Sequence, residues 1–185
     1  MTELVPTPGQ TVGPFFADAL PFAGGAELVP ASHPHTIRLH GTVYDGAGDP
    51  VPDALIELWQ ADEHGEVPQV EGSRARDGWT FTGFGRTAVD DTGHYSFTTL
   101  RPGPTEADRA PFFTITVFAR GLLHRLQTRA YLPLTDDAAA ADPLLSELSA
   151  GRRATLVVRP DGQGFVFDIR LQGDDETVFL DVGAS

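Results

Sequence analysis

The chain has 185 residues, and its 26 acidic against 13 basic side chains give a formal net charge of −13. A nucleic-acid backbone is wrapped by clustered Lys and Arg, so we expect no nucleic-acid partner. The length is that of about one domain, and the lack of cysteine excludes disulfides, thiolate zinc sites and a cysteine nucleophile.

The first ten residues, MTELVPTPGQ, do not read as a secretory leader, because they lack a basic region followed by an apolar one. No later apolar run reaches the roughly 18 residues that a membrane span needs. We therefore expect a soluble, cytoplasmic protein without a membrane partner.

Short β-type runs alternate with 20 glycines and 15 prolines, a pattern typical of an antiparallel sandwich or barrel. The predicted strands cover residues 36–45, 53–60, 94–100, 112–119, 126–132, 154–158, 164–171 and 177–181. A hairpin turn is expected at 45–53, and a long loop over 64–87. One short helix is predicted, with Asp142 as N-cap, Pro143 at its first position and Gly151 at its end.

The stretch RAPFFTITVFAR, residues 109–120, has two faces when it is read with a period of two. One face carries Phe113, Ile115 and Val117. The other carries Phe112, Thr114, Thr116 and Phe118, none of which is a usual metal ligand. The stretch therefore predicts a strand that packs and that cannot itself hold a metal.

Isolated polar residues give weaker signals. His33 and His35 have a spacing that could chelate a metal, although Pro34 between them indicates an exposed connection. Glu57 should lie on a strand face between apolar neighbours, where a carboxylate needs a partner such as Arg, and we interpret it as half of a structural ion pair. No H-E-x-x-H, G-x-S-x-G or glycine-rich phosphate motif is present.

The N-terminal stretch TPGQTVGPFF, residues 7–16, combines prolines and glycines with two adjacent phenylalanines. A free tail would be polar and frayed, so these aromatic residues indicate that the segment docks. Two interpretations remain open at this point. The segment could dock on the chain's own core or across the cleft of a partner.

Several stretches, in order and spacing, resemble the intradiol ring-cleaving dioxygenases. They are TPGQTVGPFF, HGTVYDGAGDPVPDALIELWQADEHGE, FGRTAVDDTGHYSFTTLRPGP, APFFTITVFARG, QTRAYL and FDIRLQGDDETVFLD. The resemblance covers nearly the whole chain. It implies an all-β fold, an antiparallel β-sandwich of the intradiol dioxygenase type, with a short helix and long loops. It also implies a single domain over 1–185 whose N-terminal arm, residues 1–35, docks on a partner subunit.

Catalytic members of this family hold a non-haem Fe(III) with two tyrosinates and two histidines, since phenolate oxygens are hard anionic ligands that suit this ion. Matched to that pattern, the tyrosine positions fall on Val67 and Thr105, and the histidine positions on Phe112 and Thr114. All four positions lack the family's donors. The resemblance therefore implies a chain with no catalytic residue, no metal site and no cofactor of its own.

Some members of the family are built of two kinds of chain, a catalytic β chain that carries the Fe(III) and a homologous α chain without it. The resemblance implies that the present chain is an α chain of this kind, which pairs with the β chain within a larger α–β oligomer. The α chain then helps to wall the pocket for the aromatic substrate. The positions matching this role are Thr11, Gly13, Pro14, Phe15 and Arg129.

Phe15 stands where close relatives often have Tyr, so one hydroxyl contact to the substrate would be missing. For Arg129, the alternative to a place at the substrate pocket is a structural salt bridge to a nearby acid.

Two rival functions remain. The chain could be a non-enzymatic β-sandwich binding or structural module that has kept the scaffold, because a fold does not imply a function. It could also be a self-sufficient enzyme that uses His33 and His35, although these lack neighbouring tyrosines. A rigid aromatic arm at the N-terminus favours the pocket-wall role, since a bare scaffold has no need of one.

Overall fold

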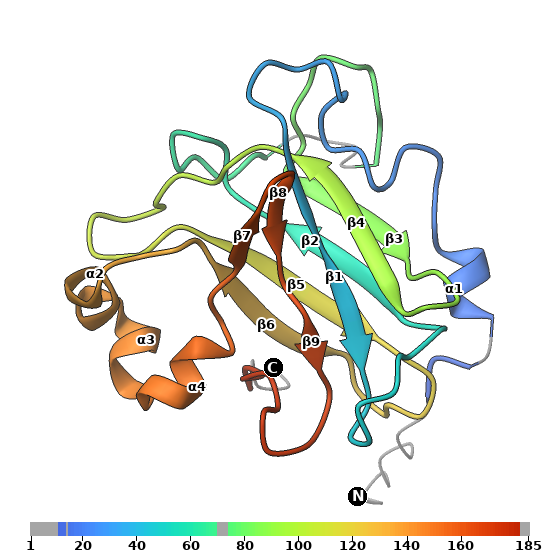
Figure 1. The fold of residues 1–185 in the computed structure, drawn as a ribbon. Helices are drawn as coiled ribbons and strands as arrows, with labels where there is room; N and C mark the ends of the chain where they lie inside the picture. Colours follow the sequence, from blue (N-terminus) through green and yellow to red (C-terminus); the bar gives the residue numbers. More distant parts are fainter. Residues whose placement is uncertain (1–10, 14, 70–73, 182–185) are drawn as a thin grey trace, which may run out of the picture.

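The computed structural model describes residues 11–13, 15–69 and 74–181, and within these ranges the chain forms two packed β-sheets (Figure 1). The first sheet has the order β4 (His94–Thr99), β1 (Ile37–Tyr44), β8 (Gly164–Val166) and β7 (Arg159–Asp161), and β9 (Ile169–Arg170) also pairs with β1. The second has the order β3 (Phe84–Ala88), β2 (Leu55–Trp59), β5 (Phe112–Phe118) and β6 (Leu126–Tyr131). The predicted all-β sandwich is confirmed, although β8 and β9 run parallel to β1.

Within the described residues, four short helices lie at the edges of the sheets. They are α1 (Phe16–Ala19), α2 (Asp136–Ala141), α3 (Pro143–Glu147) and α4 (Ala150–Ala154). Figure 1 shows α2 to α4 together on the side of β6 and β7, and α1 on the opposite side, near β3 and β4. Among the described residues, every helix is too short to traverse a lipid bilayer.

The main core lies between the two sheets and is made by the inward face of each strand. β5 shows the rule, because Phe113, Ile115 and Val117 are fully buried while Phe112 and Thr114 on the other face are partly exposed. Strand side chains alternate between faces, so burying one face of β5 commits the other face to the outside of the sandwich. The predicted two-faced strand is confirmed.

Some local predictions were wrong. Segment 154–158 is not a full strand, because α4 runs to Ala154 and Val157 forms only an isolated parallel bridge with Tyr131. Segment 177–181 contributes single backbone bonds, such as Leu180 N–H to the Gln127 carbonyl, rather than a ladder. Segment 164–171 is divided into β8 and β9.

The loop predicted over 64–87 ends in a strand, β3, at the edge of the second sheet. The turn at 45–53 exists, with an isolated bridge between Tyr44 and Pro50, but it joins strands of different sheets and is not the predicted hairpin. The predicted helix has Asp142 as its N-cap, as expected, but it ends at Glu147, with Leu148 as its C-cap, rather than at Gly151.

Glu57 confirms the predicted ion pair. Its Oε1 lies 2.8 Å from Nε and 2.5 Å from Nη2 of Arg86, which is directly opposite on β3. The Nη1 of Arg86 also donates to the carbonyl of Leu20, so the pair fastens the segment after α1 to the sheet. This carboxylate is therefore a structural group.

We predict that Tyr95→Phe destabilises the fold. The Tyr95 side chain is fully buried, and its hydroxyl donates to the carbonyl of Phe167 at 2.6 Å. Its loss leaves a buried carbonyl without this donor, which should lower the free energy of unfolding by about 1–3 kcal/mol in urea titration. Tyr44→Phe, on the partly exposed end of β1, is the matched control and should stay within about 0.5 kcal/mol of the parent. Equal effects would show that the buried hydrogen bond contributes nothing of its own.

Candidate functional site

A cavity of about 140 Å³ opens on the outer face of the second sheet, and the four positions matched to the family's iron ligands all line it. These are Val67, Thr105, Phe112 and Thr114. The other lining residues are Trp59, Gln60, Ala61, Pro68 and Gly103. Residues more than forty positions apart in the sequence thus meet at one site, as the resemblance requires.

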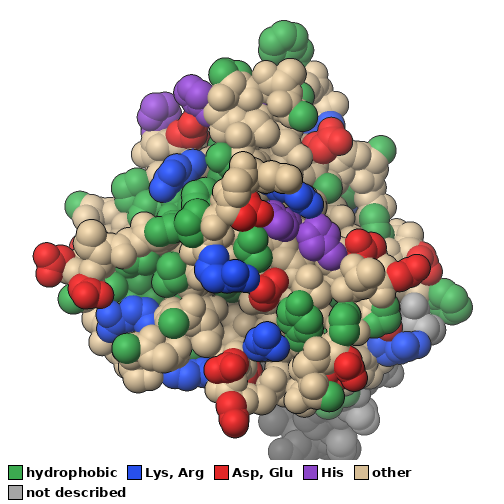
Figure 2. Space-filling view, in the orientation of Figure 1, with side chains coloured by type: hydrophobic (Ala, Val, Ile, Leu, Met, Phe, Trp, Pro, Cys, Tyr) green, Lys and Arg blue, Asp and Glu red, His purple; other side chains and the backbone are tan. Residues whose placement is uncertain are grey.

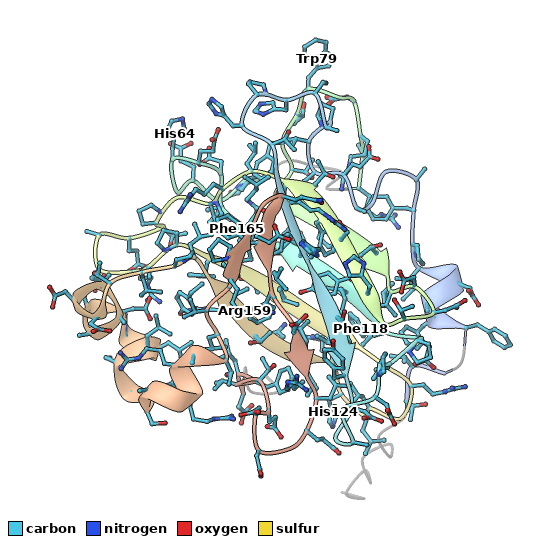
Figure 3. The ribbon with its side chains drawn as sticks, in the orientation of Figure 1. His64, Trp79, Phe118, His124, Arg159 and Phe165 are labelled. Atoms are coloured by element: carbon cyan, nitrogen blue, oxygen red, sulfur yellow. The ribbon has the colours of Figure 1, made fainter. Side chains whose placement is uncertain are left out.

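Strand register brings the cavity's wall residues together. Thr114 lies opposite Trp59 on β2 and opposite Arg129 on β6, so the three side chains form a row across the outer face. Phe112 is two residues from Thr114 on the same face. In Figure 3, His64 marks the loop after β2 at the upper left of the molecule, and Phe118 marks the other end of β5, at the lower right. The cavity therefore lies at the loop end of the sheet.

Asp62 shapes the loop that carries Val67. Its Oδ1 accepts from the backbone N–H groups of His64 and Glu66, each at 2.9 Å, and its carbonyl accepts from those of Gly65 and Gly103. The bond to Gly103 is 2.7 Å long and joins this loop to the one that carries Thr105. A single aspartate thus sets the spacing of two cavity walls.

Gln60 closes the base of the site from the buried side. Its amide nitrogen donates to the carbonyls of Ala61 and Leu100, and its Oε1 accepts from the hydroxyl of Thr99 at 2.6 Å. A buried amide is tolerated only when its polar atoms are paired, and here they are. Sequence analysis missed this residue, since its partners on and beside β4 are about forty positions away.

The residues at the four ligand positions do not fit iron. Val67 and Phe112 have no donor atom, and the neutral hydroxyls of Thr105 and Thr114 do not replace anionic phenolates or imidazoles. Among the described residues, no group of three or more His, Cys, Asp or Glu side chains could hold a metal. His35 lies instead against Glu63, with its Nδ1 3.0 Å from the carboxylate.

Arg129 lies beside the cavity and takes part in a hydrogen-bonded chain. Its guanidinium lies 4.1 Å from the centre of the Phe112 ring, and its Nη1 donates to the Tyr131 hydroxyl at 3.2 Å. That hydroxyl donates in turn to Asp142. Burial raises the pKa of Tyr131, and the hydrogen bond from Arg129 opposes this effect. The arginine therefore reaches a carboxylate through a hydroxyl, and none of the ion pairs among the described residues includes it.

The N-terminal positions lie apart from the lining of this cavity. Thr11 and Phe15 are exposed, Phe15 with 73% of its surface accessible, and Gly13 is partly exposed with a φ of 82°. Pro14 lies outside the described residues. Phe16, by contrast, is buried against the chain's own body. The two adjacent phenylalanines thus point to different environments, one internal and one open.

The chain is similar to known dioxygenases over most of its length. The model of the dioxygenase family matches residues 13–173. The protocatechuate 3,4-dioxygenase alpha chain of Burkholderia cepacia is 41% identical over 98% of this chain and 100% of its own length. The beta chain from the same organism is 31% identical over 85% of this chain and 78% of its own. The solved dioxygenase domain from Streptomyces sp. SirexAA-E has a TM-score of 0.60 at 27% identity, covering 91% of this chain and 99% of that domain.

We predict that Gly65→Ala costs more stability than Gly48→Ala. Both glycines have a φ of 86°, so both substitutions pay a similar backbone penalty of about 1–2 kcal/mol. A Cβ at Gly65 would also meet the Pro104 carbonyl oxygen, whereas one at Gly48 has nothing within 4 Å. The Gly65 variant should therefore lose about 1–3 kcal/mol more in urea unfolding. Equal losses would mean that the two loops are not held in contact at the cavity.

Proposed function

The chain belongs to the family of intradiol dioxygenases that includes the protocatechuate 3,4-dioxygenase chains, and on that basis we propose that it is a non-catalytic α subunit of such an enzyme. The observation that carries the proposal is the cavity whose four family ligand positions hold no suitable donors. A chain of this kind needs a partner to take part in ring cleavage. The homologous β chain is the natural candidate.

The holoenzyme would convert 3,4-dihydroxybenzoate and O₂ to 3-carboxy-cis,cis-muconate, with both oxygen atoms entering the product, a step of aromatic catabolism in the β-ketoadipate pathway. The Fe(III) of the β chain would bind the catecholate and activate it towards O₂. The present chain would contribute walls and orientation only. We place the complex in the cytoplasm, as a higher-order α–β oligomer.

The N-terminal arm, residues 1–35, would dock on the β chain and wall its substrate pocket through Thr11, Gly13, Pro14 and Phe15. Val12, Phe15 and Leu20 of this arm are all exposed, which supports this role, because apolar side chains that gather on a surface are a mark of an interface. The proposed single domain covers residues 1–185, and the part of it that follows the arm would form the scaffold that presents the arm.

Arg129 would supply positive charge at the carboxylate end of the shared pocket. A net charge of −13 repels an anionic substrate at long range, so a local arginine is needed. The guanidinium of Arg129 donates one hydrogen bond to Tyr131 and, among the described residues, none to a carboxylate, which leaves N–H donors for an anion.

The rival is a non-enzymatic binding or structural module on the same scaffold. This rival predicts that the activity of a β chain does not depend on the present chain, and it assigns no role to the exposed Phe15. The end-to-end match to an alpha chain favours the subunit role.

We predict that the chain purified alone binds no stoichiometric iron and cleaves no ring. Co-expressed with a β chain that carries the family's tyrosines and histidines, it should co-purify as a complex with about one iron per α–β pair. Metal analysis, size-exclusion chromatography and an O₂-uptake assay are the measurements. An iron-containing, active preparation of the lone chain would refute the proposal, as would a β chain that is fully active and never associates with this one.

We also predict that Arg129→Ala raises the KM of the complex for protocatechuate by about tenfold or more. A carboxylate bound to a planar guanidinium gains roughly 1.5–3 kcal/mol, which the variant would lose. Catechol, which has no carboxylate, should be much less affected. Arg120→Ala is the control, because Arg120 is an exposed arginine paired with Asp53 at the end of β5. Equal losses with both substrates, or no loss, would leave Arg129 as a structural residue.

A further inference from the structure

Two histidines and an aspartate from three strands meet on the outer face of the first sheet. His40 on β1 and His94 on β4 face outwards, since the strand residues beside them are buried. The Nδ1 of His40 lies 3.2 Å from the Nε2 of His94, and the two ring centres are 5.5 Å apart. The Nε2 of His40 lies 2.8 Å from the Oδ2 of Asp161 on β7. One imidazole therefore contacts side chains from β4 and β7, which lie on either side of β1 (Figure 1).

The hydrogen bonds of the histidine pair, His40 and His94, limit how many protons it can hold. A carboxylate only accepts, so the Nε2 of His40 donates to Asp161, and in the neutral ring Nδ1 accepts from the Nε2–H of His94. One added proton fits, because a charged His40 donates from Nδ1 to the Nε2 of His94, whose own proton then lies on Nδ1. A second added proton does not fit, because two N–H groups would then face each other 3.2 Å apart.

The groups around the pair act differently on its two members. Asp161 faces His40, and the pKa of Asp161 is lowered, mainly by the N–H of Gln163 and then by the hydrogen bond with His40, so it stays a carboxylate in mild acid. The pKa of His94 is also lowered, first by partial burial and then by the neighbouring His40 and Arg38. The first added proton therefore belongs on His40, and His94 is the ring that resists the second.

Two carboxylates oppose the lowering of the His94 pKa. They are Asp90, in the turn before β4, and Asp168, between β8 and β9. Asp168 is already paired with Arg159 of β7 at 2.9 Å. Asp90 accepts from the backbone N–H of His94 at 3.1 Å, so it lies at the base of that side chain. A charged His94 ring that leaves His40 therefore has a carboxylate close by in Asp90.

We propose that the histidine pair is a pH-sensitive switch whose moving part is His94. While at most one of the two rings is charged, His94 packs on His40; when both are charged, the His94 ring turns out towards Asp90. The switch lies on the first sheet, whereas the cavity lies on the second, and it needs neither iron nor a partner subunit. Its test is therefore independent of the proposed function.

The switch makes the folded state less stable in mild acid. The unfolded chain takes up a proton on His94 at the ordinary pKa of 6.5, whereas the folded chain does so only at the lowered pKa. Between these two values the unfolded chain binds more protons, so the stability present above 6.5 is lost as the pH falls through this window. The lowered pKa of Asp161 acts in the same direction, but only below the ordinary value of 3.8.

The switch is tested by ring NMR of the full chain between about pH 8 and about pH 5, the range in which histidines titrate. His94 should gain its charge below 6.5. Before this step, the ring nitrogen shifts should show the proton of His94 moving from Nε2 to Nδ1 as His40 becomes charged. In His40→Gln, which keeps an amide donor for Asp161, the midpoint of His94 should move up towards 6.5, because a neighbouring positive charge is gone.

Urea unfolding measures the effect on stability. When the pH is lowered from about 7.5 to about 5.5, the unfolding equilibrium constant of the parent should rise by up to about tenfold more than that of His94→Gln, since one unit of pKa difference is tenfold. Glutamine keeps an N–H donor for His40 and cannot become charged. His124→Gln, an exposed change in the loop after β5 (Figure 3), is the matched control and should respond to pH as the parent does.

Three results would overturn the proposal. The first is a His94 ring that gains its charge at or above 6.5, or without the earlier change of tautomer. The second is an unchanged His94 midpoint in His40→Gln, which would mean that burial alone acts on this ring. The third is an equal pH response of the parent and His94→Gln. Urea unfolding curves at about pH 7.5 establish beforehand that each variant is folded.

Discussion

The structure depends on the position of β5 between β2 and β6, where its side chains must alternate between two environments. Phe113, Ile115 and Val117 fill the core between the sheets, and the ladders on both sides fix this choice of face. A slip of one residue would exchange the two faces and expose the core set, so the register is strongly specified. The same register sends Phe112 and Thr114 to the cavity. The main core and the site are thus built by one strand from different side chains, although Phe112 also packs against the smaller core cluster that contains Tyr131 and Leu145.

This separation explains how a chain can lack the iron-ligand side chains of the family and still keep the dioxygenase fold. The residues that replace ligands at the outer face contribute little to the inter-sheet core, whereas the loops around them are fixed by backbone bonds to Asp62 and by the Gln60 amide. Neither tether requires a metal. The charged side chains seen on the opposite sheet are of both signs and intermixed (Figure 2), so that face carries no single-sign patch that would attract a polyanion.

The sequence predicted those elements whose signal is local. β1, β4, β5 and β6 were found within two residues, because a long run of alternation suffices to identify them. β3 was missed: it is short and glycine-rich, and Gly85 is required there because a Cβ would meet the Leu28 side chain and approach Gly25. The four ligand positions were predicted by resemblance and do meet at one cavity. The tethers of Asp62 and Gln60 could not be predicted, since they join loops far apart in the sequence.

Arg129 has two possible roles in the sequence, and the structure shows which groups it contacts within this chain. A salt bridge was one alternative, but within the described part of the chain the hydrogen bonds of Arg129 reach a carboxylate, that of Asp142, through the hydroxyl of Tyr131. Asp142 is already engaged: it caps α3 by accepting from the N–H groups of Leu144 and Leu145, and it also accepts from that of Ala110. The proposed role of Arg129 depends on a guanidinium that is held by a ring and a hydroxyl rather than by a direct carboxylate partner, because recognition of an anionic ligand on an acidic protein needs positive charge.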